Sequence, residues 1–137
     1  MSLFSFSGTP PTDLGVTSGQ LKSCPSTPNC VNSQAPADDK EHFIASFAYT
    51  GSAKDAIARL KQVVEGMERS TINKVTDDYL YAEFSSKLMG FVDDVEFYAP
   101  PGESVIHTRT AARLGKSDLG ANRKRTEEIR TRFAAMG

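Results

Sequence analysis

Four short strand-like segments lie between two stretches of helical periodicity, and this succession constrains the fold more than any other feature. The predicted strands cover 71–76, 79–87, 91–98 and 104–112. Turn signals separate them at Asp77-Asp78, near Gly90 and at Pro100-Pro101-Gly102. Because the connections are short, consecutive strands are expected to pair as antiparallel neighbours. The sequence therefore predicts an antiparallel meander.

One more strand and a helix are predicted before the meander. Aromatic and small residues alternate over 43–49, which is typical of a strand. Ser52 then suits the N-cap of a helix, and Asp55 places a negative charge in its first turn. The apolar residues of this helix fall on one stripe: Ala53, Ala56, Ile57, Leu60, Val63, Val64 and Met67.

A second helix is predicted over 121–135. Its inward stripe is Thr126, Ile129, Phe133 and Met136, and pairs of opposite charge at four-residue spacing lie on the other side: Arg123–Glu127, Lys124–Glu128 and Glu128–Arg132. The order strand, helix, four strands, helix predicts an α+β domain. We expect an antiparallel sheet of about five strands with both helices on one face. TATA-box-binding-protein-like folds have the same order of elements, an analogy of topology that says nothing about DNA.

Residues 1–40 differ in composition from the rest and are predicted to form an irregular N-terminal arm before a single α+β domain over 41–137. The arm is rich in Ser, Thr, Pro, Gly, Asn and Asp. Its distinctive piece runs from Cys24 to Cys30, where two prolines stiffen the turn and could bring the sulfurs together.

The spacing of the two cysteines leaves several chemical alternatives open. Five intervening residues match neither the CxxC of thiol oxidoreductases nor a zinc half-site, and zinc would need two further ligands from His42 and His107. We therefore predict no metal site. A disulfide is expected in an oxidising compartment, two reduced structural thiols in the cytosol, and a redox switch is a further alternative.

Charge is nearly balanced overall but unevenly distributed along the chain. The formal net charge is −1, so no global field attracts nucleic acid or a membrane. From Arg109 onward there are eight Lys and Arg against three Asp and Glu, whereas the preceding part has eight against fourteen. No run approaches the roughly 18 apolar residues of a membrane helix, and the first residues lack the basic region of a secretory signal. We expect a cytoplasmic protein, or an exported or lumenal one if a signal has been removed.

The first candidate site is a cluster of arginines near the end of the chain. The closing helix begins with Arg123-Lys124-Arg125, although the amino end of a helix favours acidic residues. Strand alternation places Arg109 and Arg113 on one face, and the loop is expected to return Arg123 and Arg125 near them. The residues proposed to hold an anionic ligand are Arg109, Arg113, Asp118, Asn122, Arg123 and Arg125, with Asp118 and Asn122 also suited to capping. The alternative is that nearby carboxylates satisfy these arginines internally.

The second candidate site is the acidic segment Asp93-Asp94-Val95-Glu96. One reading is a pair of carboxylates for acid–base or metal chemistry. The other is that these residues are salt-bridge partners of the arginines, which is the reading favoured here because acid–base or metal chemistry beside so many arginines is uncommon. Tyr79, Tyr81 and Tyr98 could stack on a ligand, although alternating aromatic residues in strands usually serve packing.

Three segments together resemble domain-of-unknown-function family 1499. They are Cys24-Pro-Ser-Thr-Pro-Asn-Cys-Val31, Asp93-Asp-Val-Glu-Phe97 and the stretch from Arg109 through Asn122-Arg123-Lys124-Arg125-Thr126-Glu127. The similarity extends from about residue 20 to the end, with Ala112 where the family usually has serine. The resemblance implies the domain but no established activity. It also implies bacterial, cyanobacterial and plant relatives, some with export or plastid-targeting signals, in which a Cys24–Cys30 disulfide could form.

Three functional classes follow from these features. The favoured one is a non-catalytic binding or structural module whose arginine-bearing loop holds a small anionic ligand, with no cofactor. The second is a small enzyme that uses Asp93 or Asp94 beside the arginines. The third is a thiol-based redox or interaction protein built on Cys24 and Cys30.

Overall fold

A computed structural model describes residues 8–86, 90–115 and 117–137 of the chain. Residues 1–7 of the predicted arm, Lys87 at the end of a predicted strand, and Lys116 of the arginine loop lie outside the described residues. The elements in order are β1 (Cys30–Asn32), β2 (Phe47–Ala48), α1 (Ala53–Glu65), β3 (Ser70–Val75), β4 (Tyr79–Ser85), β5 (Val92–Tyr98), β6 (Val105–Ala112) and α2 (Ala121–Ala135). The α+β class and the succession of strand, helix, four strands and helix are confirmed.

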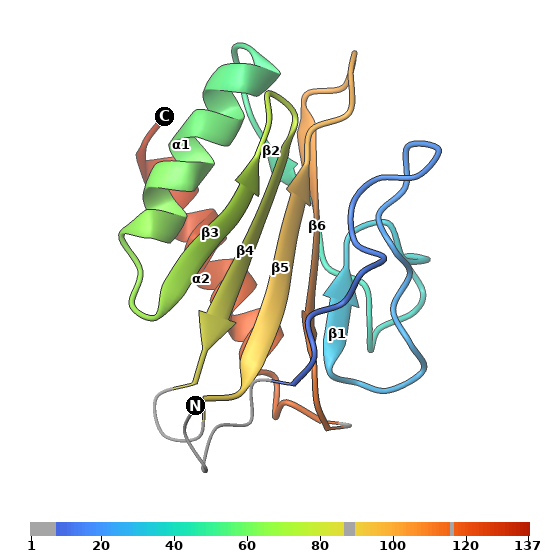
Figure 1. Cartoon of the computed structure of the whole chain (residues 1–137). Helices are drawn as coiled ribbons and strands as arrows, with labels where there is room; N and C mark the ends of the chain where they lie inside the picture. Colours follow the sequence, from blue (N-terminus) through green and yellow to red (C-terminus); the bar gives the residue numbers. More distant parts are fainter. Residues whose placement is uncertain (1–7, 87–89, 116) are drawn as a thin grey trace.

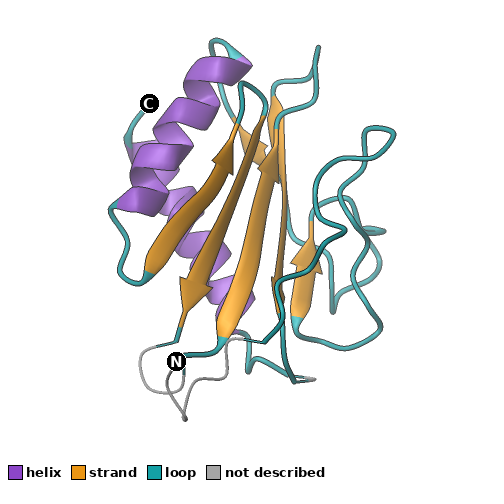
Figure 2. Ribbon diagram, viewed as in Figure 1, coloured by secondary structure: helices purple, strands orange, loops and turns teal. Residues whose placement is uncertain are grey.

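The sheet is antiparallel and has the strand order β1-β6-β5-β4-β3, with the short β2 pairing separately with β6 (Figure 2). The predicted meander forms β3 to β6. The predicted strand over 43–49 is reduced to Phe47–Ala48. The strand β1 was not predicted, since it lies in the segment expected to be irregular. Its three residues are too few to show a period, and they form a strand because they pair with β6.

The helix α1 begins as predicted. The Ser52 hydroxyl accepts a hydrogen bond from the backbone N–H of Asp55 at 3.1 Å, which satisfies one of the free donors of the first turn. The buried residues of the helix are Ala56, Ile57, Leu60, Val63 and Val64, all from the predicted stripe.

The helix α2 matches its predicted bounds but not its predicted surface. Thr126, Ile129 and Phe133 are buried, as is Asn122, whereas Met136 is 42% exposed and therefore lies outside the core. Among the predicted ion pairs of the outer side, Glu128–Arg132 is present at 3.3 Å. Arg123 has instead turned toward backbone carbonyls, as described below.

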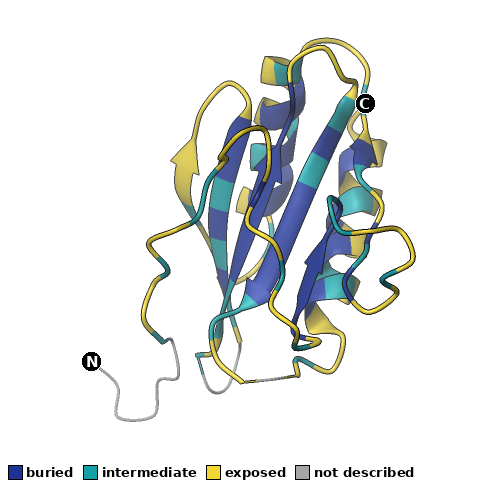
Figure 3. Cartoon of the chain, turned by 90° about the vertical axis from the view of Figure 1, so that its right-hand side faces the viewer, coloured by how far each residue is buried: buried dark blue, intermediate teal, exposed yellow. Residues whose placement is uncertain are grey.

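Both helices cover one face of the sheet, and the segment before β1 lies across the other face (Figure 1). The apolar core fills the helix side, where Leu80 and Phe97 are neighbours in register and Phe47 packs on Phe97 with ring centroids 5.8 Å apart. The central strands are buried along most of their length (Figure 3). Burying each such side chain contributes about 1.5–3 kcal/mol.

On the face turned away from the helices, many of the buried residues are polar or charged. The register there places Tyr81, Glu96, Arg109 and Asn32 side by side across β4, β5, β6 and β1. A smaller apolar cluster of Leu21, Tyr79 and Tyr98 connects the arm to this face. The arm is therefore the cover of a polar sheet face and not an appendage.

Candidate functional site

The carboxylate of Asp94 is the centre of a buried ion network on the arm side of the sheet. Arg113 donates to both of its oxygens, from Nε to Oδ2 and from Nη2 to Oδ1, each at 2.9 Å. Arg113 also contacts Glu83, and the Tyr81 hydroxyl donates to Asp94 Oδ1 at 2.6 Å. Burial and the bond to Asp94 raise the pKa of Tyr81 to about 12, so its proton stays in place at neutral pH.

Glu96 and Arg109 lie side by side in the next row of the same face. The Tyr79 hydroxyl donates to Glu96 Oε2 at 2.5 Å, and the backbone N–H of Gly15, from the arm, donates to the same oxygen at 2.8 Å. Arg109 Nη1 lies 3.9 Å from Glu96 Oε1, which is a looser contact. Burial raises the pKa of Glu96 and lowers the pKa of Arg109, because each charge is removed from water.

Arg125 lies on the opposite side of the sheet and pairs with Asp93. Its Nη1 is 2.9 Å from Asp93 Oδ2 and 3.2 Å from Asn122 Oδ1, and its guanidinium lies 4.8 Å from the centre of the Phe84 ring. Burial raises the pKa of Asp93, while the charge of Arg125 lowers it. Asp93 is therefore a salt-bridge partner of an arginine, as the favoured interpretation of the acidic segment predicted.

Asp118 and Asn122 organise the amino end of α2. Asp118 accepts hydrogen bonds from the backbone N–H groups of Gly120 and Asn122 at 2.9 and 3.0 Å, and from the Asn122 side chain at 2.7 Å. Asn122 is fully buried and also bonds Thr110 of β6. Gly120 has φ 79°, a left-handed conformation that suits glycine. Asp118 therefore satisfies N–H groups at the start of α2 from the preceding loop. The N-cap position itself is Gly120, and the Asn122 side chain bonds Thr110 and Asp118, so the predicted capping role of Asn122 was wrong.

Arg123 and Arg130 of α2 have backbone partners that were not predicted from the sequence. Arg123 Nη2 donates to the backbone carbonyl of Phe43 at 2.9 Å. Arg130 donates to the carbonyls of Ser46 and Ala45 at 2.8 and 2.7 Å and lies over the Phe47 ring. These carbonyls belong to a segment with little regular pairing, so the arginines satisfy acceptors that no strand uses. No local sequence signal marks a carbonyl as unpaired.

The structure does not bring the four predicted arginines together. Thr110 bonds Asn122 of α2, so by alternation its neighbour Arg109, and Arg113 beyond it, face away from that helix. Arg109 and Arg113 lie beneath the arm, whereas Arg123 and Arg125 lie on the helix side. The prediction of a single cluster was wrong because it took the strand and the helix to present the same face.

A groove of about 580 Å³ opens beside the amino half of α2, between the α1–β3 connection and the end of β4. Its charged residues are Glu68, Arg69, Lys124, Arg125, Glu128 and Arg132. Glu68 pairs with Arg69 at 2.9 Å, and Glu128 with Arg132 at 3.3 Å. Lys124 is exposed, and among the residues that the structure describes it forms no ion pair. The cations exceed the acids, and the first turn of α2 carries no acidic residue.

Asp93 and Asp94 are poorly placed for acid–base chemistry. Both oxygens of Asp94 are bonded to Arg113, and its side chain is 3% exposed. Asp93 is held by Arg125. A general acid or base must reach a substrate proton, and these carboxylates are already occupied. Their arrangement matches the alternative in which the acids are salt-bridge partners.

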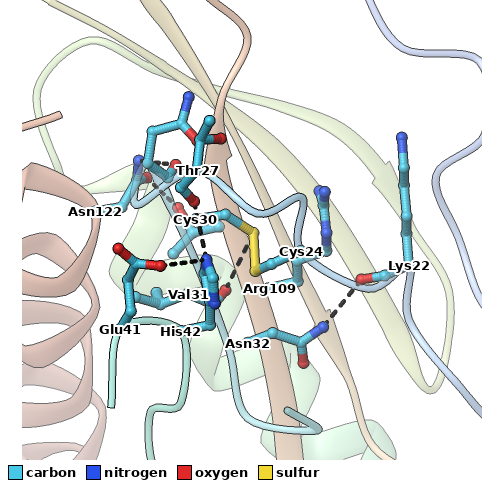
Figure 4. Close-up of a disulfide and its surroundings, with 12 residues drawn as sticks. Lys22, Cys24, Thr27, Cys30, Val31, Asn32, Glu41, His42, Arg109 and Asn122 are labelled. Carbon is cyan, nitrogen blue, oxygen red and sulfur yellow. Dashed lines mark hydrogen bonds and ion pairs between the residues drawn. A yellow bond between two sulfur atoms is a disulfide. The ribbon is translucent and has the colours of Figure 1, made fainter. Parts of the chain in front are cut away.

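Cys24 and Cys30 are joined by a disulfide in the structure (Figure 4). His42 ties down the loop between them: its Nε2 donates to the Thr27 carbonyl at 2.9 Å, and its Nδ1 lies 2.8 Å from Asp39 Oδ2. The bonds to Thr27 and to Asp39 raise the pKa of His42. His107 instead bonds Ser33 at 2.9 Å, and burial lowers its pKa. Within the described part of the chain, no group of three His, Cys, Asp or Glu residues could hold a metal ion.

Comparison with known proteins supplies a family and no activity. A model of a family described as a protein of unknown function, DUF1499, matches residues 20–133. No curated protein matches the chain. No helix among the described residues is both long and apolar enough to cross a membrane. The family match spans β1 to the last turns of α2, including the disulfide loop, both acid–arginine sites and the capped end of α2. The chain therefore belongs to the DUF1499 family of proteins of unknown function.

Proposed function

We propose that the protein is a non-catalytic binding module, and that the groove beside α2 receives an anionic group, a carboxylate or a phosphate. The observation that carries the proposal is Lys124, an exposed cation in the first turn of a helix without acidic residues there. Helix amino ends and cationic side chains together favour anions. Of the predicted ligand residues, Arg125 remains at this site.

The side chain of Arg125 is already fixed in a position from which it could bind an anion. Asp93, Asn122 and the Phe84 ring fix its guanidinium, so little side-chain entropy is lost when a ligand arrives. A bound anion would add a second acceptor to a cation already shared with Asp93. The occupied state of Asp93 and Asp94 supports a binding role over a catalytic one.

The test is isothermal titration and thermal shift with inorganic phosphate, sulfate and citrate, each against sodium chloride of equal ionic strength. We expect stabilisation by at least one of these anions, weakened about three- to tenfold in affinity in Lys124→Ala, since one lost charge-assisted contact is worth about 1 kcal/mol. Lys54→Ala, which removes a lysine of α1 outside the groove, is the matched control.

Two results would contradict the proposal. One is that no anion stabilises the protein beyond the chloride control. The other is that Lys124→Ala and Lys54→Ala bind the anion equally well, which would place any binding elsewhere on the molecule.

A further inference from the structure

The two sulfurs of the disulfide differ in their surroundings. Cys30 is the first residue of β1, is paired in register with Ala111 of β6, and is fully buried. Cys24 lies in a segment without regular structure and is partly exposed. Figure 4 shows the bond bridging this irregular segment and the strand. One sulfur is thus fixed in the sheet, and the other is on the side open to solvent.

A cavity of about 160 Å³ lies against the exposed partner. Its lining includes Cys24, Ser23, Gln34, Asp39 and His42, and Cys30 is not part of it. Leu21, Ala35 and Pro36 also line it, so the cavity offers both polar and apolar contacts to a small thiol compound. Of the two cysteines, only Cys24 lines this cavity, so a nucleophile that enters it approaches the bond from the side of Cys24.

We propose that the Cys24–Cys30 bond is a thiol-exchange site, and that a small dithiol or a dithiol reductase attacks it at Cys24. The attacking thiolate forms a bond to Cys24 Sγ, the Cys24–Cys30 bond breaks, and Cys30 leaves as a thiolate that takes up a proton. The second thiol of the reductant then attacks the mixed disulfide and displaces Cys24. In total two electrons and two protons pass to the protein, and the reductant becomes a disulfide.

The contacts of the loop between the two cysteines differ at its two ends, so reduction of the disulfide is expected to move the Cys24 end and not the Cys30 end. Asn29, next to Cys30, stays anchored because its side chain donates to the Gly115 carbonyl at 2.8 Å and its own carbonyl accepts from the Ala112 N–H at 3.0 Å. On the side of Cys24, the hydrogen bonds described for residues 25–28 join Thr27 alone to the rest of the molecule: its carbonyl accepts from His42, and its hydroxyl donates to Asn29 Oδ1 at 2.9 Å. Opening the bond therefore loosens residues 24–28 while β1 stays paired, so that Cys30 is kept in place for re-oxidation.

The experiment compares two single-thiol variants, Cys30→Ser and Cys24→Ser, which both lack the disulfide. Each folded variant is reacted with 5,5′-dithiobis(2-nitrobenzoic acid), with folding checked by circular dichroism. We expect the Cys24 thiol left in Cys30→Ser to react about tenfold faster or more than the Cys30 thiol left in Cys24→Ser, because thiol reactivity follows exposure. In guanidinium chloride the two rates should become equal.

The intact protein provides a second measurement that does not depend on either variant. Native protein is treated with reduced glutathione, quenched with iodoacetamide and digested with trypsin, which places both cysteines in the peptide 23–40. Fragmentation should locate glutathione on Cys24 and the carbamidomethyl group on Cys30. Equal reactivity of the two single thiols, glutathione on Cys30, or a bond that resists thiols until the protein is unfolded would overturn the proposal.

Discussion

At the scale of single residues, the arm-side face of the sheet is unusual in burying charges that are paired with one another. Asp94 is 3% exposed and Arg113 is 6% exposed, and they share two hydrogen bonds. Such a pair brings little net stability compared with an apolar replacement of both residues, but removing one partner leaves a buried charge without compensation. The network therefore fixes which side chains can occupy this face.

Arg113→Leu is predicted to destabilise the protein by about 3–5 kcal/mol, because Asp94 and Glu83 lose their shared cation. Urea denaturation followed by circular dichroism measures the change. Arg132→Leu is the control: its pair with Glu128 is about half exposed, and its removal should cost less than about 1 kcal/mol. Equal effects of the two substitutions would show that the network is solvated.

His42 is predicted to make stability depend on pH. Its pKa is raised in the folded protein above the ordinary 6.5 by Thr27 and Asp39, so its contribution is fully present below about pH 6.5 and is lost as pH rises through the folded pKa. We expect the unfolding free energy of wild type minus that of His42→Gln to be larger at pH 5.5 than at pH 9. Subtracting the variant removes the contributions of Glu96, Asp93 and His107, whose pKa values also shift. A difference that is flat or rises with pH would contradict this assignment.

At the scale of elements, the amino end of α2 connects three parts of the chain. Asn122 bonds Thr110 of β6, Asp118 of the preceding loop and the carbonyl of Asn29 beside the disulfide. It also accepts from Arg125 in the groove. Two of the three cations of the first turn are thus offset without acidic residues in the helix: Arg125 pairs with Asp93, and Arg123 donates to backbone carbonyls. Lys124 forms no ion pair among the described residues, and it is the cation on which the proposed anion site depends.

Asn122→Ala is predicted to cost about 2–4 kcal/mol, because Asp118, Thr110 and the Asn29 carbonyl lose a buried partner together. Thermal and urea unfolding measure the loss. Asn73→Ala, at an exposed position of β3, is the matched control and should change stability by less than about 0.5 kcal/mol. A loss at Asn122 no larger than that at Asn73 would mean that water replaces these bonds.

At the scale of the whole molecule, the sheet is covered by helices on one face and on the other by the arm, which contains the Cys24–Cys30 disulfide (Figure 1). Among the residues that the structure describes, the apolar core on the helix side begins at Phe47. The arm is attached through polar contacts, Gly15 to Glu96 and Asn29 to Gly115, both at 2.8 Å, and through Leu21. The two covers therefore contribute differently: the helices supply the core, and the arm shields charges from water.

A chain that begins at Gln20 is predicted to keep the fold and to lose about 1–3 kcal/mol, because Glu96 loses the Gly15 donor to a charged acceptor. Introducing Glu96→Gln into both the long and the short chain forms a double-mutant cycle. The truncation should cost less in the Gln background, since a neutral acceptor loses a weaker bond. Denaturant midpoints give all four values, and identical truncation costs in both backgrounds would exclude Glu96 as the point of contact.

Local interactions explain most of what could be predicted. The cap of α1 at Ser52, the stripe beneath it, the turns of the meander and the bonds of Asp118 to the start of α2 all depend on neighbours a few positions away. The family assignment rests likewise on contiguous motifs and is confirmed. These features are encoded in adjacent residues, so the sequence by itself determined the element order, the α+β class and the family.

The tertiary structure alone decided which face each side chain occupies. The register of β1 on β6 joins residues about 80 positions apart and turns an irregular segment into a sheet edge. The packing of α2 on the Thr110 side of β6 separates Arg109 and Arg113 from Arg123 and Arg125. Long-range packing also gives Arg123 the carbonyl of Phe43 as partner. Alternation along a strand means that neighbouring side chains point to opposite faces of the sheet. Which face the helices cover and which the arm covers is decided only when these elements pack on the sheet. For that physical reason the acidic partners of Arg113 and Arg125 could be predicted from the sequence, whereas the backbone carbonyls that bind Arg123 and Arg130 could not.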